Sequence, residues 1–438
     1  TNLEVRQFAR RLQDAGADAF NVTGGWHESR VPQITMNVPN GAYVYLAQGI
    51  KQAVDVPVVA CNRINDPWLA EEILMQGRAD LIGMARGLMA DPDLPRKAME
   101  GRFNEIRKCV ACNQGCLDAI FSGESCRCLV NARVGREAET EIKLAATPRK
   151  VLVIGGGPAG LEAARVAALR GHEVSLWEKE EVLGGQLQLA AAVPGRADFY
   201  HLIDYLEESL FALGVEVIVD KEATPEEIEA FRPDAIVVAT GARPVIPAIP
   251  GVDLDHVVGA WEVIGGEAEL GQKVVVIGGG ATGCEVAMYI ASMGTIDSDT
   301  LRFLLVNGAE PVERIKELAL RGIKEVVVIE QDRTAGRGIG ASTRWSILQD
   351  LRRMGVDIRT STRVLAIAED GVVVAEPDGQ TEKIAADSVV IAAGSRAENS
   401  LFENLKQKFP EVYLVGDACN PRTVLDAIRE GFDVGNSI

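Results

Sequence analysis

The feature that most constrains the fold of this 438-residue chain is a glycine-rich turn that occurs twice. Each copy, Gly155-Gly-Gly-Pro-Ala-Gly160 and Gly278-Gly-Gly-Ala-Thr-Gly283, follows a short apolar run and precedes a helical pattern. In this context the glycines allow a tight turn and a close approach of a pyrophosphate, and the helix N-terminus faces the phosphates. The repeat therefore predicts two α/β dinucleotide-binding domains in one chain.

The first copy is accompanied by the other parts of a flavin site. The apolar strand 173–177 ends on Glu178, which is placed to bind a ribose. Glycine motifs around Gly185 and Gly241 are typical of flavoprotein reductases, and Asp417 can accept a ribityl hydroxyl before a final helix. These parts predict an FAD domain formed by residues 149–260 and 385–438. The residues expected to contact FAD are Gly155, Gly157, Ala159, Gly160, Glu178, Gly185, Gln186, Arg196, Thr240, Gly416 and Asp417.

The second copy predicts an NAD(H)-binding domain, residues 261–384, inserted into the first. Its acidic partner is expected about 20 residues after the turn, but a polar, helix-containing insertion at 295–324 intervenes. Either 302–306 or 326–329 could be the next strand. We favour 326–329 because it ends on Glu330, whose carboxylate suits the 2′-hydroxyl of NADH and repels a 2′-phosphate. Arg333 nearby leaves NADPH open. The expected NADH contacts are Gly278, Gly280, Gly283 and Glu330.

Five of the eight cysteines lie within residues 109–128. Cys109, Cys112, Cys116 and Cys128 have C-x2-C-x3-C-x11-C spacing, which favours a [4Fe–4S] cluster held by three close sulfurs and one distant one. Structural zinc more often uses two separated pairs, and disulfides are the remaining alternative. Cys126 is a fifth cysteine close by, and we favour Cys128 as the fourth ligand.

The rest of the cysteine pattern bears on the route of electrons. No cysteine lies between Cys128 and Cys284, so the FAD domain lacks the redox disulfide of thioredoxin-reductase-type enzymes. Electrons must leave the FAD domain by another route, and the cysteine cluster is the upstream candidate. Cys61, Cys284 and Cys419 are interpreted as small core residues.

The first 105 residues alternate strand and helix patterns, which predicts parallel βα units. Three parallel strands cannot close a barrel, so we interpret residues 1–105 as the C-terminal part of a TIM barrel whose amino-terminal part is missing. Residues 106–148 would then form the iron–sulfur segment. Arg63, Ala85 and Arg86 follow the last two strands, where such barrels commonly bind a phosphate. Surface arginines that cap loops are the alternative.

His27 lies in a polar loop after the first of these strands. An imidazole there is placed to donate a hydrogen bond to a carbonyl or to transfer a proton. A lone histidine is, however, more often a structural hydrogen-bonding residue.

Composition excludes several classes of function. The chain has 63 acidic and 45 basic residues, a net charge of −18, which argues against nucleic-acid or anionic-membrane partners. No apolar run approaches the ~20 residues of a membrane span, and no signal peptide is found. Together with the clustered cysteines, these features predict a cytoplasmic protein of a reducing compartment.

Several motifs together resemble a known family, the iron–sulfur flavoenzymes of the old yellow enzyme class, which includes bacterial 2,4-dienoyl-CoA reductase, 2-enoate reductases and, more distantly, trimethylamine dehydrogenase. Besides the cysteines and both glycine turns, the matching segments are Gly25-Trp26-His27-Glu28-Ser29-Arg30-Val31-Pro32, Asn62-Arg63-Ile64-Asn65-Asp66-Pro67, Met84-Ala85-Arg86, Leu129-Val130-Asn131 and Gly338-Ile339-Gly340-Ala341-Ser342-Thr343. They cover the whole chain, and their combination is far more specific than any one of them.

The resemblance implies FMN in the barrel, a [4Fe–4S] cluster, FAD and a nicotinamide cofactor, for which Glu330 favours NADH over NADPH. It implies that electrons pass from NADH through FAD and the cluster to FMN, which reduces an activated C=C bond of a 2-enoate, an enoyl-CoA or a 2,4-dienoyl-CoA. By the same resemblance His27 lies near the substrate carbonyl, with Glu28, Ser29 and Arg30 at the substrate, and Arg63, Ala85 and Arg86 hold the FMN phosphate. A barrel tyrosine supplies the proton in the reductase branch, and that part of the barrel is absent here.

Two functions remain open. The first is an ene-reductase of small unsaturated carbonyl compounds or CoA thioesters. The second is a subunit that oxidises NADH and delivers electrons to a partner protein. Either function is compatible with a homo-oligomer. The intact Arg63 and Arg86 loops favour the first function, because an electron-transfer subunit need not keep an FMN phosphate site.

Overall fold

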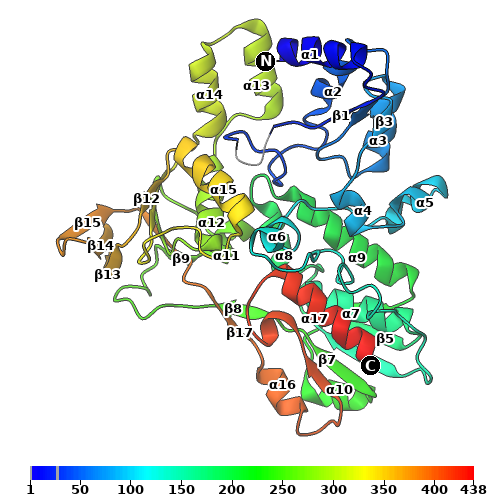
Figure 1. Ribbon diagram of the computed structural model, residues 1–438. Helices are drawn as coiled ribbons and strands as arrows, with labels where there is room; N and C mark the ends of the chain where they lie inside the picture. Colours follow the sequence, from blue (N-terminus) through cyan, green and yellow to red (C-terminus); the bar gives the residue numbers. More distant parts are fainter. Residues whose placement is uncertain (1, 26–28) are drawn as a thin grey trace. The chain divides into compact units, whose positions relative to one another are not determined.

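The computed structural model describes residues 2–25 and 29–438 and divides into two compact units. The first unit runs through Leu187 and includes 198–241 and 399–438, and the second contains 188–197 and 242–398. The expected α/β class is confirmed (Figure 1). The boundaries expected at 261 and 384 fall inside the second unit, because the strands just outside them pair into its sheet.

The barrel part of the first unit has three parallel strands, β1 (Phe20–Val22), β2 (Val58–Ala60) and β3 (Leu81–Ile82), in that order. Its helices are α1 (Asn2–Asp14), α2 (Val44–Lys51), α3 (Pro67–Met75), α4 (Arg86–Ala90) and α5 (Leu94–Met99). A core that includes Val44, Ile50, Val58 and Ile73 packs between helices and strands. The alternation of strand and helix is as expected, except that α4 follows β3 at once.

The second part of the first unit is a five-stranded parallel sheet in the order β18-β7-β4-β5-β6. These strands are β4 (Lys150–Ile154), β5 (Glu173–Trp177), β6 (Glu216–Ile218), β7 (Ala235–Val238) and β18 (Val412–Leu414). The central strand β4 is apolar and almost wholly buried, as expected for a strand covered on both faces. Helix α7 (Pro158–Leu169) packs against α17 (Val424–Ser437), which returns from the end of the chain (Figure 1).

The second unit contains a parallel sheet in the order β12-β11-β10-β16-β9. The strands are β9 (Val257–Gly259), β10 (Lys273–Ile277), β11 (Glu325–Ile329), β12 (Asp357–Arg359) and β16 (Ser388–Ile391). A meander of β13 (Arg363–Ala368), β14 (Gly371–Ala375) and β15 (Thr381–Ala385) and the pair β8 (Ala242–Pro244) and β17 (Ser395–Ala397) complete it. Its helices are α11 (Ala260–Gly265), α12 (Ala281–Ser292), α13 (Ser298–Asn307), α14 (Val312–Leu320) and α15 (Ala341–Arg353).

The two candidate segments for the strand after the second glycine turn have different structures. Residues 302–306 lie within helix α13, capped by the Asp297 side chain. Strand β11 pairs with β10 in continuous parallel register, from Lys273 opposite Glu325 to Ile277 opposite Ile329. The preference for the strand that ends on Glu330 is therefore confirmed.

The remaining helices lie between these strands and helices in the chain. They are α6 (Leu117–Phe121), α8 (Gln186–Ala192), α9 (Tyr200–Ala212), α10 (Pro225–Phe231) and α16 (Ser400–Leu405), with 3-10 helices at Phe103–Glu105, Ala197–Phe199 and Gly416–Ala418. Within the described residues, no helix has the length and apolar character required to cross a membrane.

Candidate functional site

The first glycine turn forms a cradle at the N-terminus of α7. Gly155 has a φ of 108°, and a Cβ atom on Gly160 would lie 1.9 Å from the carbonyl oxygen of Gly155. Strand, turn and helix can therefore meet this closely only with glycine at both positions. A Cβ on Gly157, by contrast, would meet no protein atom within 4 Å. The open side of the turn thus lies where a bound pyrophosphate would approach.

Glu178 is fixed against this turn by two backbone hydrogen bonds. Its Oε2 accepts from the nitrogen of Gly156 at 2.5 Å, and its Oε1 accepts from the nitrogen of Glu180 at 2.9 Å. The residue is 6% exposed. The nitrogen of Gly184 donates to the oxygen of Gly156 at 2.8 Å, which brings the second glycine motif and Gly185 beside the turn. The structure thus assembles these predicted residues in one place.

The C-terminal residues of the predicted flavin site lie in the same unit. Asp417 accepts hydrogen bonds from Gln186 Nε2 at 3.4 Å and from the nitrogen of Arg422 at 3.0 Å. Burial raises the pKa of the Asp417 carboxyl, which these hydrogen bonds partly offset. The nitrogen of Gly416 donates to Glu430, so this N–H already has a protein partner.

Three other predicted residues differ in their surroundings. Ala159 is buried under the C-terminal helix, where a Cβ on Gly431 would lie 2.2 Å from its carbonyl oxygen. Thr240 follows the end of β7. Arg196 belongs to the second unit and forms an ion pair with Glu285 of α12, with both side chains largely buried. Burial raises the pKa of Glu285, and Arg196 opposes that effect.

The second glycine turn repeats this geometry. Gly278 has a φ of 106°, and a Cβ on Gly283 would lie 1.8 Å from the oxygen of Gly278. Glu330 Oε2 accepts from the nitrogen of Gly279 at 2.8 Å, and its Oε1 accepts from the nitrogen of Asp332 at 2.8 Å. The residue is 8% exposed. Both folds therefore hold an acid at the end of the second strand in the same way.

Basic side chains also lie near Glu330. Arg333 is exposed, and Arg337, which the sequence interpretation did not consider, forms an exposed ion pair with Asp332 at 3.3 Å. Gly280 forms an isolated β-bridge with Arg337, which places that backbone beside the turn. The signal available in the sequence was the position of Arg337 in the glycine-rich loop before α15.

A cavity of about 470 Å³ lies at the carboxyl ends of the three barrel strands. Its lining includes Cys61, Arg63, Ala85, Arg86 and Cys109. This is the end of a barrel at which parallel βα units present their loops, and where a cofactor phosphate is commonly bound. The residues predicted to hold a phosphate are thus brought together.

The two arginines of this cavity also contact the protein. Arg63 is buried, donates to the oxygen of Val38 at 2.7 Å and pairs with Asp198 at 2.6 Å. Arg86 Nη1 donates to the oxygen of Ile34 at 2.8 Å and to Asn113 Oδ1 at 2.6 Å. None of these four contacts was predictable from the sequence, because each joins segments far apart in the chain.

The loop predicted to face the substrate is described only in part. His27 and Glu28 lie outside the described residues. The Ser29 hydroxyl donates to the oxygen of Val31 at 2.8 Å, and Arg30 is exposed. The nitrogen of Gly24 donates to Asn62 Oδ1 at 2.9 Å, which ties the start of this loop to the edge of the barrel cavity.

Four of the five clustered cysteines line one cavity, namely Cys109, Cys112, Cys116 and Cys128. Burial, followed by the neighbouring thiols, raises the pKa of Cys112 well above its usual value and that of Cys128 to about 11. Among the described residues, no three His, Cys, Asp or Glu side chains converge as a single metal ion would require. The structure thus brings the four predicted ligands together around one cavity.

The other cysteines only partly match the expectation that they are small core residues. Cys284 is fully buried and agrees with it. Cys419 is exposed, so that prediction was wrong, because the loop after β18 leaves it at the surface. Cys61 lines the barrel cavity, and burial raises the pKa of its thiol.

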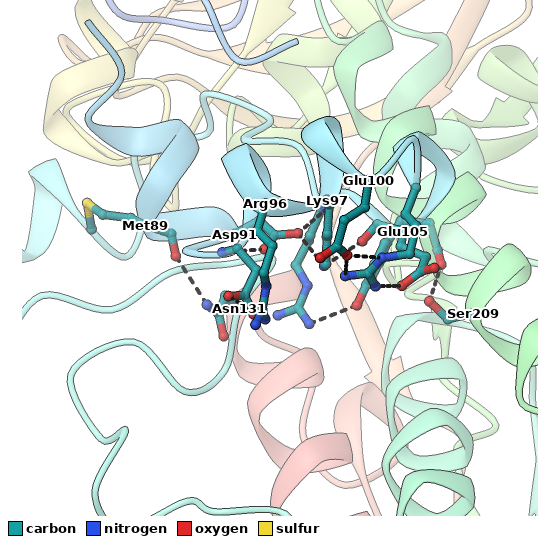
Figure 2. A network of polar contacts seen from close by, with 12 residues as sticks. Met89, Asp91, Arg96, Lys97, Glu100, Glu105, Asn131 and Ser209 are labelled. Atoms are coloured by element: carbon teal, nitrogen blue, oxygen red, sulfur yellow. Dashed lines mark hydrogen bonds and ion pairs between the residues drawn. The ribbon is translucent and has the colours of Figure 1, made fainter. Parts of the chain in front are cut away.

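A buried carboxylate holds the chain that enters the cysteine segment (Figure 2). Asp91 is 4% exposed, and its Oδ2 accepts from the nitrogen of Arg107 at 2.9 Å and from Lys97 Nζ at 2.7 Å. On the other side, Asn131 Nδ2 donates to the oxygen of Met89 at 3.1 Å. These contacts fix both ends of the cysteine segment against the barrel part.

Comparison with known proteins agrees with this arrangement. Residues 2–105 match the NADH:flavin oxidoreductase / NADH oxidase family, and residues 149–431 match the pyridine nucleotide-disulphide oxidoreductase family. The chain belongs to the iron–sulfur flavoenzymes of the old yellow enzyme class. In this flavoenzyme the barrel strands and most of the barrel cavity lie in the first matched region, and both glycine turns lie in the second.

Individual relatives of this flavoenzyme have different names. A metal reductase of Desulforamulus reducens is 50% identical, with 99% of this chain and 65% of that protein covered. A cinnamate reductase of Clostridium sporogenes is 32% identical, with 98% and 60% covered. The structure of a 2-naphthoyl-CoA reductase matches with a TM-score of 0.90 and 34% identity, over 100% of this chain and 63% of that one. The chain thus spans somewhat less than two thirds of the length of these relatives.

Proposed function

We propose that the protein reduces the activated C=C bond of a 2-enoate, an enoyl-CoA or a related unsaturated carbonyl compound with electrons from NADH. The observation that carries the proposal is the barrel cavity, which keeps Arg63, Ala85 and Arg86 at its rim while the same chain keeps two complete dinucleotide cradles. The names of two relatives, a cinnamate reductase and a 2-naphthoyl-CoA reductase, support this class of substrate.

The residues present fit the cofactors that this reaction needs. The open face at Gly157 suits a pyrophosphate, Glu178 suits the ribose of FAD, and Asp417 suits its ribityl chain. Glu330 is placed to bind the ribose of NADH. Arg86 and the backbone at Ala85 supply positive charge and N–H groups for a flavin phosphate. When bound, the flavins would supply hydride acceptance from NADH and delivery of electrons to the C=C bond.

The four cysteines fit a [4Fe–4S] cluster better than zinc. Structural zinc more often uses two separated pairs of ligands. The four cysteines of this chain line one shared cavity, and their C-x2-C-x3-C-x11-C spacing, with three close sulfurs and one distant sulfur, suits a cluster. When bound it would carry single electrons between the two flavins.

The substrate end of the proposal depends on the loop after β1. There we assign His27 to a hydrogen bond with the substrate carbonyl, and Glu28, Ser29 and Arg30 to substrate contacts, from the resemblance alone. A hydrogen bond to the carbonyl withdraws electron density from the conjugated C=C bond and so favours hydride attack at its far carbon. The histidine is thus an orienting and polarising group in this proposal.

A second function is favoured by other relatives. A metal reductase and an NADH oxidase of Thermoanaerobacter brockii, 50% and 38% identical, are named for reactions without a C=C substrate. A protein that oxidises NADH and passes electrons to a metal ion or a partner protein would use the same cradles. It would not need the phosphate-binding rim of the barrel cavity.

The test uses the full-length protein, anaerobically, with NADH and a panel of cinnamate, shorter 2-enoates and enoyl-CoAs. We expect NADH consumption to match a product two hydrogens heavier than one class of substrate. A His27→Ala variant should lose this reaction but retain NADH-dependent reduction of ferricyanide. If no member of the panel is reduced while ferric citrate is, the second function replaces the first.

A further inference from the structure

Asn113 occupies a special position in the cysteine segment. It lies between Cys112 and Cys116, is 1% exposed, and lines the cavity formed by the four cysteines. Its φ of 63° is in the left-handed region, which asparagine tolerates better than most residues. The side chain is thus held inside the protein, beside the space assigned to the cluster.

The orientation of the Asn113 amide is determined by its neighbour. Arg86 Nη1 lies 2.6 Å from the atom assigned as Oδ1. A guanidinium only donates hydrogen bonds, so the atom that faces Arg86 must be the amide oxygen. The amide nitrogen therefore points away from Arg86, and no alternative flip of the side chain satisfies this contact.

The amide nitrogen of Asn113 is a buried donor without an acceptor. Within the part of the chain that the structure describes, its Nδ2 has no hydrogen-bond partner. Leaving such a donor unsatisfied costs about 1–3 kcal/mol, so buried donors are nearly always paired in native proteins. An acceptor that is not part of the polypeptide is therefore expected in the cysteine cavity.

We propose that Asn113 Nδ2 donates a hydrogen bond to a sulfur atom of the bound cluster and that Arg86 is the positioning residue for this donor. The proposal rests on the [4Fe–4S] cluster of the proposed function. Hydrogen bonds to cluster sulfurs stabilise the more negative, reduced form and so raise the reduction potential. Asn113 thus raises the reduction potential of the cluster.

Arg86 connects this effect to the barrel cavity. The same residue lines both the cysteine cavity and the barrel cavity. A phosphate bound at the barrel rim would attract the guanidinium that orients Asn113, so occupation of the flavin cavity and the potential of the cluster are coupled. A buried water as the partner of Nδ2 is the competing explanation.

The experiment is an EPR-monitored redox titration of full-length protein, with iron, acid-labile sulfide and FMN measured on each sample. Asn113→Gly suits the positive φ and removes the donor without adding charge. We expect it to keep the cluster and to lower the equilibrium constant for its one-electron reduction about tenfold, a shift of ~59 mV. Asn131→Ala is the matched control for loss of a nearby asparagine amide: its amide nitrogen already donates to the oxygen of Met89, so its potential should move by much less than that of Asn113→Gly.

Arg86→Lys should keep part of the effect, because a lysine can still donate to Asn113 Oδ1, whereas Arg86→Leu, which cannot donate, should approach Asn113→Gly. An unchanged potential in Asn113→Gly with a full cluster overturns the proposal and supports the water. If Asn113→Gly fails to retain its cluster, pulsed EPR of protein labelled with [δ-15N]asparagine decides. A coupling between the reduced cluster and a side-chain 15N that persists in Asn131→Ala, and so does not come from Asn131, supports the proposal. The absence of such a coupling overturns it. Wild-type protein without iron and sulfide overturns the cluster itself.

Discussion

The carboxylate of Glu330 lies 2.8 Å from the backbone nitrogen of Gly279 and accepts its hydrogen bond. The same relationship joins Glu178 to Gly156 in the first fold, 2.5 Å apart. Each carboxylate is also held by the backbone nitrogen two residues later. Because the glycine turn orients each acid in the same way, we expect each carboxylate to be preorganised for the ribose of a dinucleotide bound at its turn.

The position of Glu330 predicts a preference for NADH over NADPH. A 2′-phosphate would bring like charges together in a partly desolvated site, at a cost of ~1–3 kcal/mol, or roughly 5- to 150-fold in kcat/KM. Glu330→Gln should narrow this ratio, mainly by improving NADPH use. The measurement is FAD reduction under both cofactors. Equal kcat/KM values for NADH and NADPH in the wild type would contradict the assignment. Arg337→Ala, which removes a nearby cation, should lower kcat/KM for NADPH below that of the wild type.

Two glycines of the first turn should respond oppositely to alanine. In Gly160→Ala the new Cβ would lie 1.9 Å from a backbone oxygen, so the free energy of unfolding should fall by about 2 kcal/mol or more. In Gly157→Ala the Cβ meets no protein atom, so the melting temperature should stay near that of the wild type while FAD content falls. Calorimetry and flavin absorbance measure both effects. Full FAD retention in Gly157→Ala would show that the pyrophosphate does not pass this face.

If the cysteine cavity holds the cluster, loss of the cluster should separate the reduction of FAD from the reduction of FMN. Cys112→Ala should lose iron and sulfide and retain NADH reduction of FAD, whereas FMN should no longer be reduced. Direct hydride transfer requires reacting atoms ~3–3.5 Å apart, so we expect two flavins bound to different domains to exchange electrons through the cluster instead. Anaerobic stopped-flow spectroscopy of a variant that keeps both flavins measures this. Cys126→Ser, outside the cavity lining, is the control and should behave as the wild type.

Two results would contradict this route. FMN reduction at the normal rate in Cys112→Ala would make the cluster structural. About one zinc per chain without acid-labile sulfide in the wild type would replace the cluster by a zinc site.

Asp66 predicts a defined pH dependence of stability. Although burial acts in the opposite direction, the hydrogen bond and charge of Lys108 and the backbone N–H groups at the start of α3 lower the pKa of this carboxyl. A lowered pKa in the folded state adds stability above the usual value near 4, and that stability is lost as the pH falls through the folded value. Asp66→Ala, which also removes the helix cap, should cost about 1 kcal/mol at pH 7.

Urea unfolding at pH 7, 5 and 3.5 measures this prediction. The difference between wild type and Asp66→Ala should be constant above pH 5 and shrink below pH 4. Asp66→Asn keeps an oxygen for the cap but cannot titrate, so its own stability should follow pH less steeply than that of the wild type. A stability difference that stays constant down to pH 3.5 would show that the pKa of Asp66 is not lowered in the folded state.

Much of the fold followed from patterns that are local in the sequence. A glycine turn between a buried strand and a helix, or an alternation of strands and helices, fixes backbone geometry over a few tens of residues at most. The two dinucleotide folds, the barrel part and the strand that ends on Glu330 were predictable for this reason. The cysteine spacing likewise identified the four residues that line one cavity, since three of them are near neighbours in the chain.

The tertiary structure alone decided the partners of the charged and polar groups. Arg63 pairs with Asp198, 135 residues away, and Arg86 orients Asn113 from another segment. Cys419, apolar enough for a core, lies at the surface. Such contacts depend on which distant segments the packed cores bring together, and one sequence contains no local pattern for them. The sequence therefore determined which local motifs form, and folding decided which side chains they place against one another.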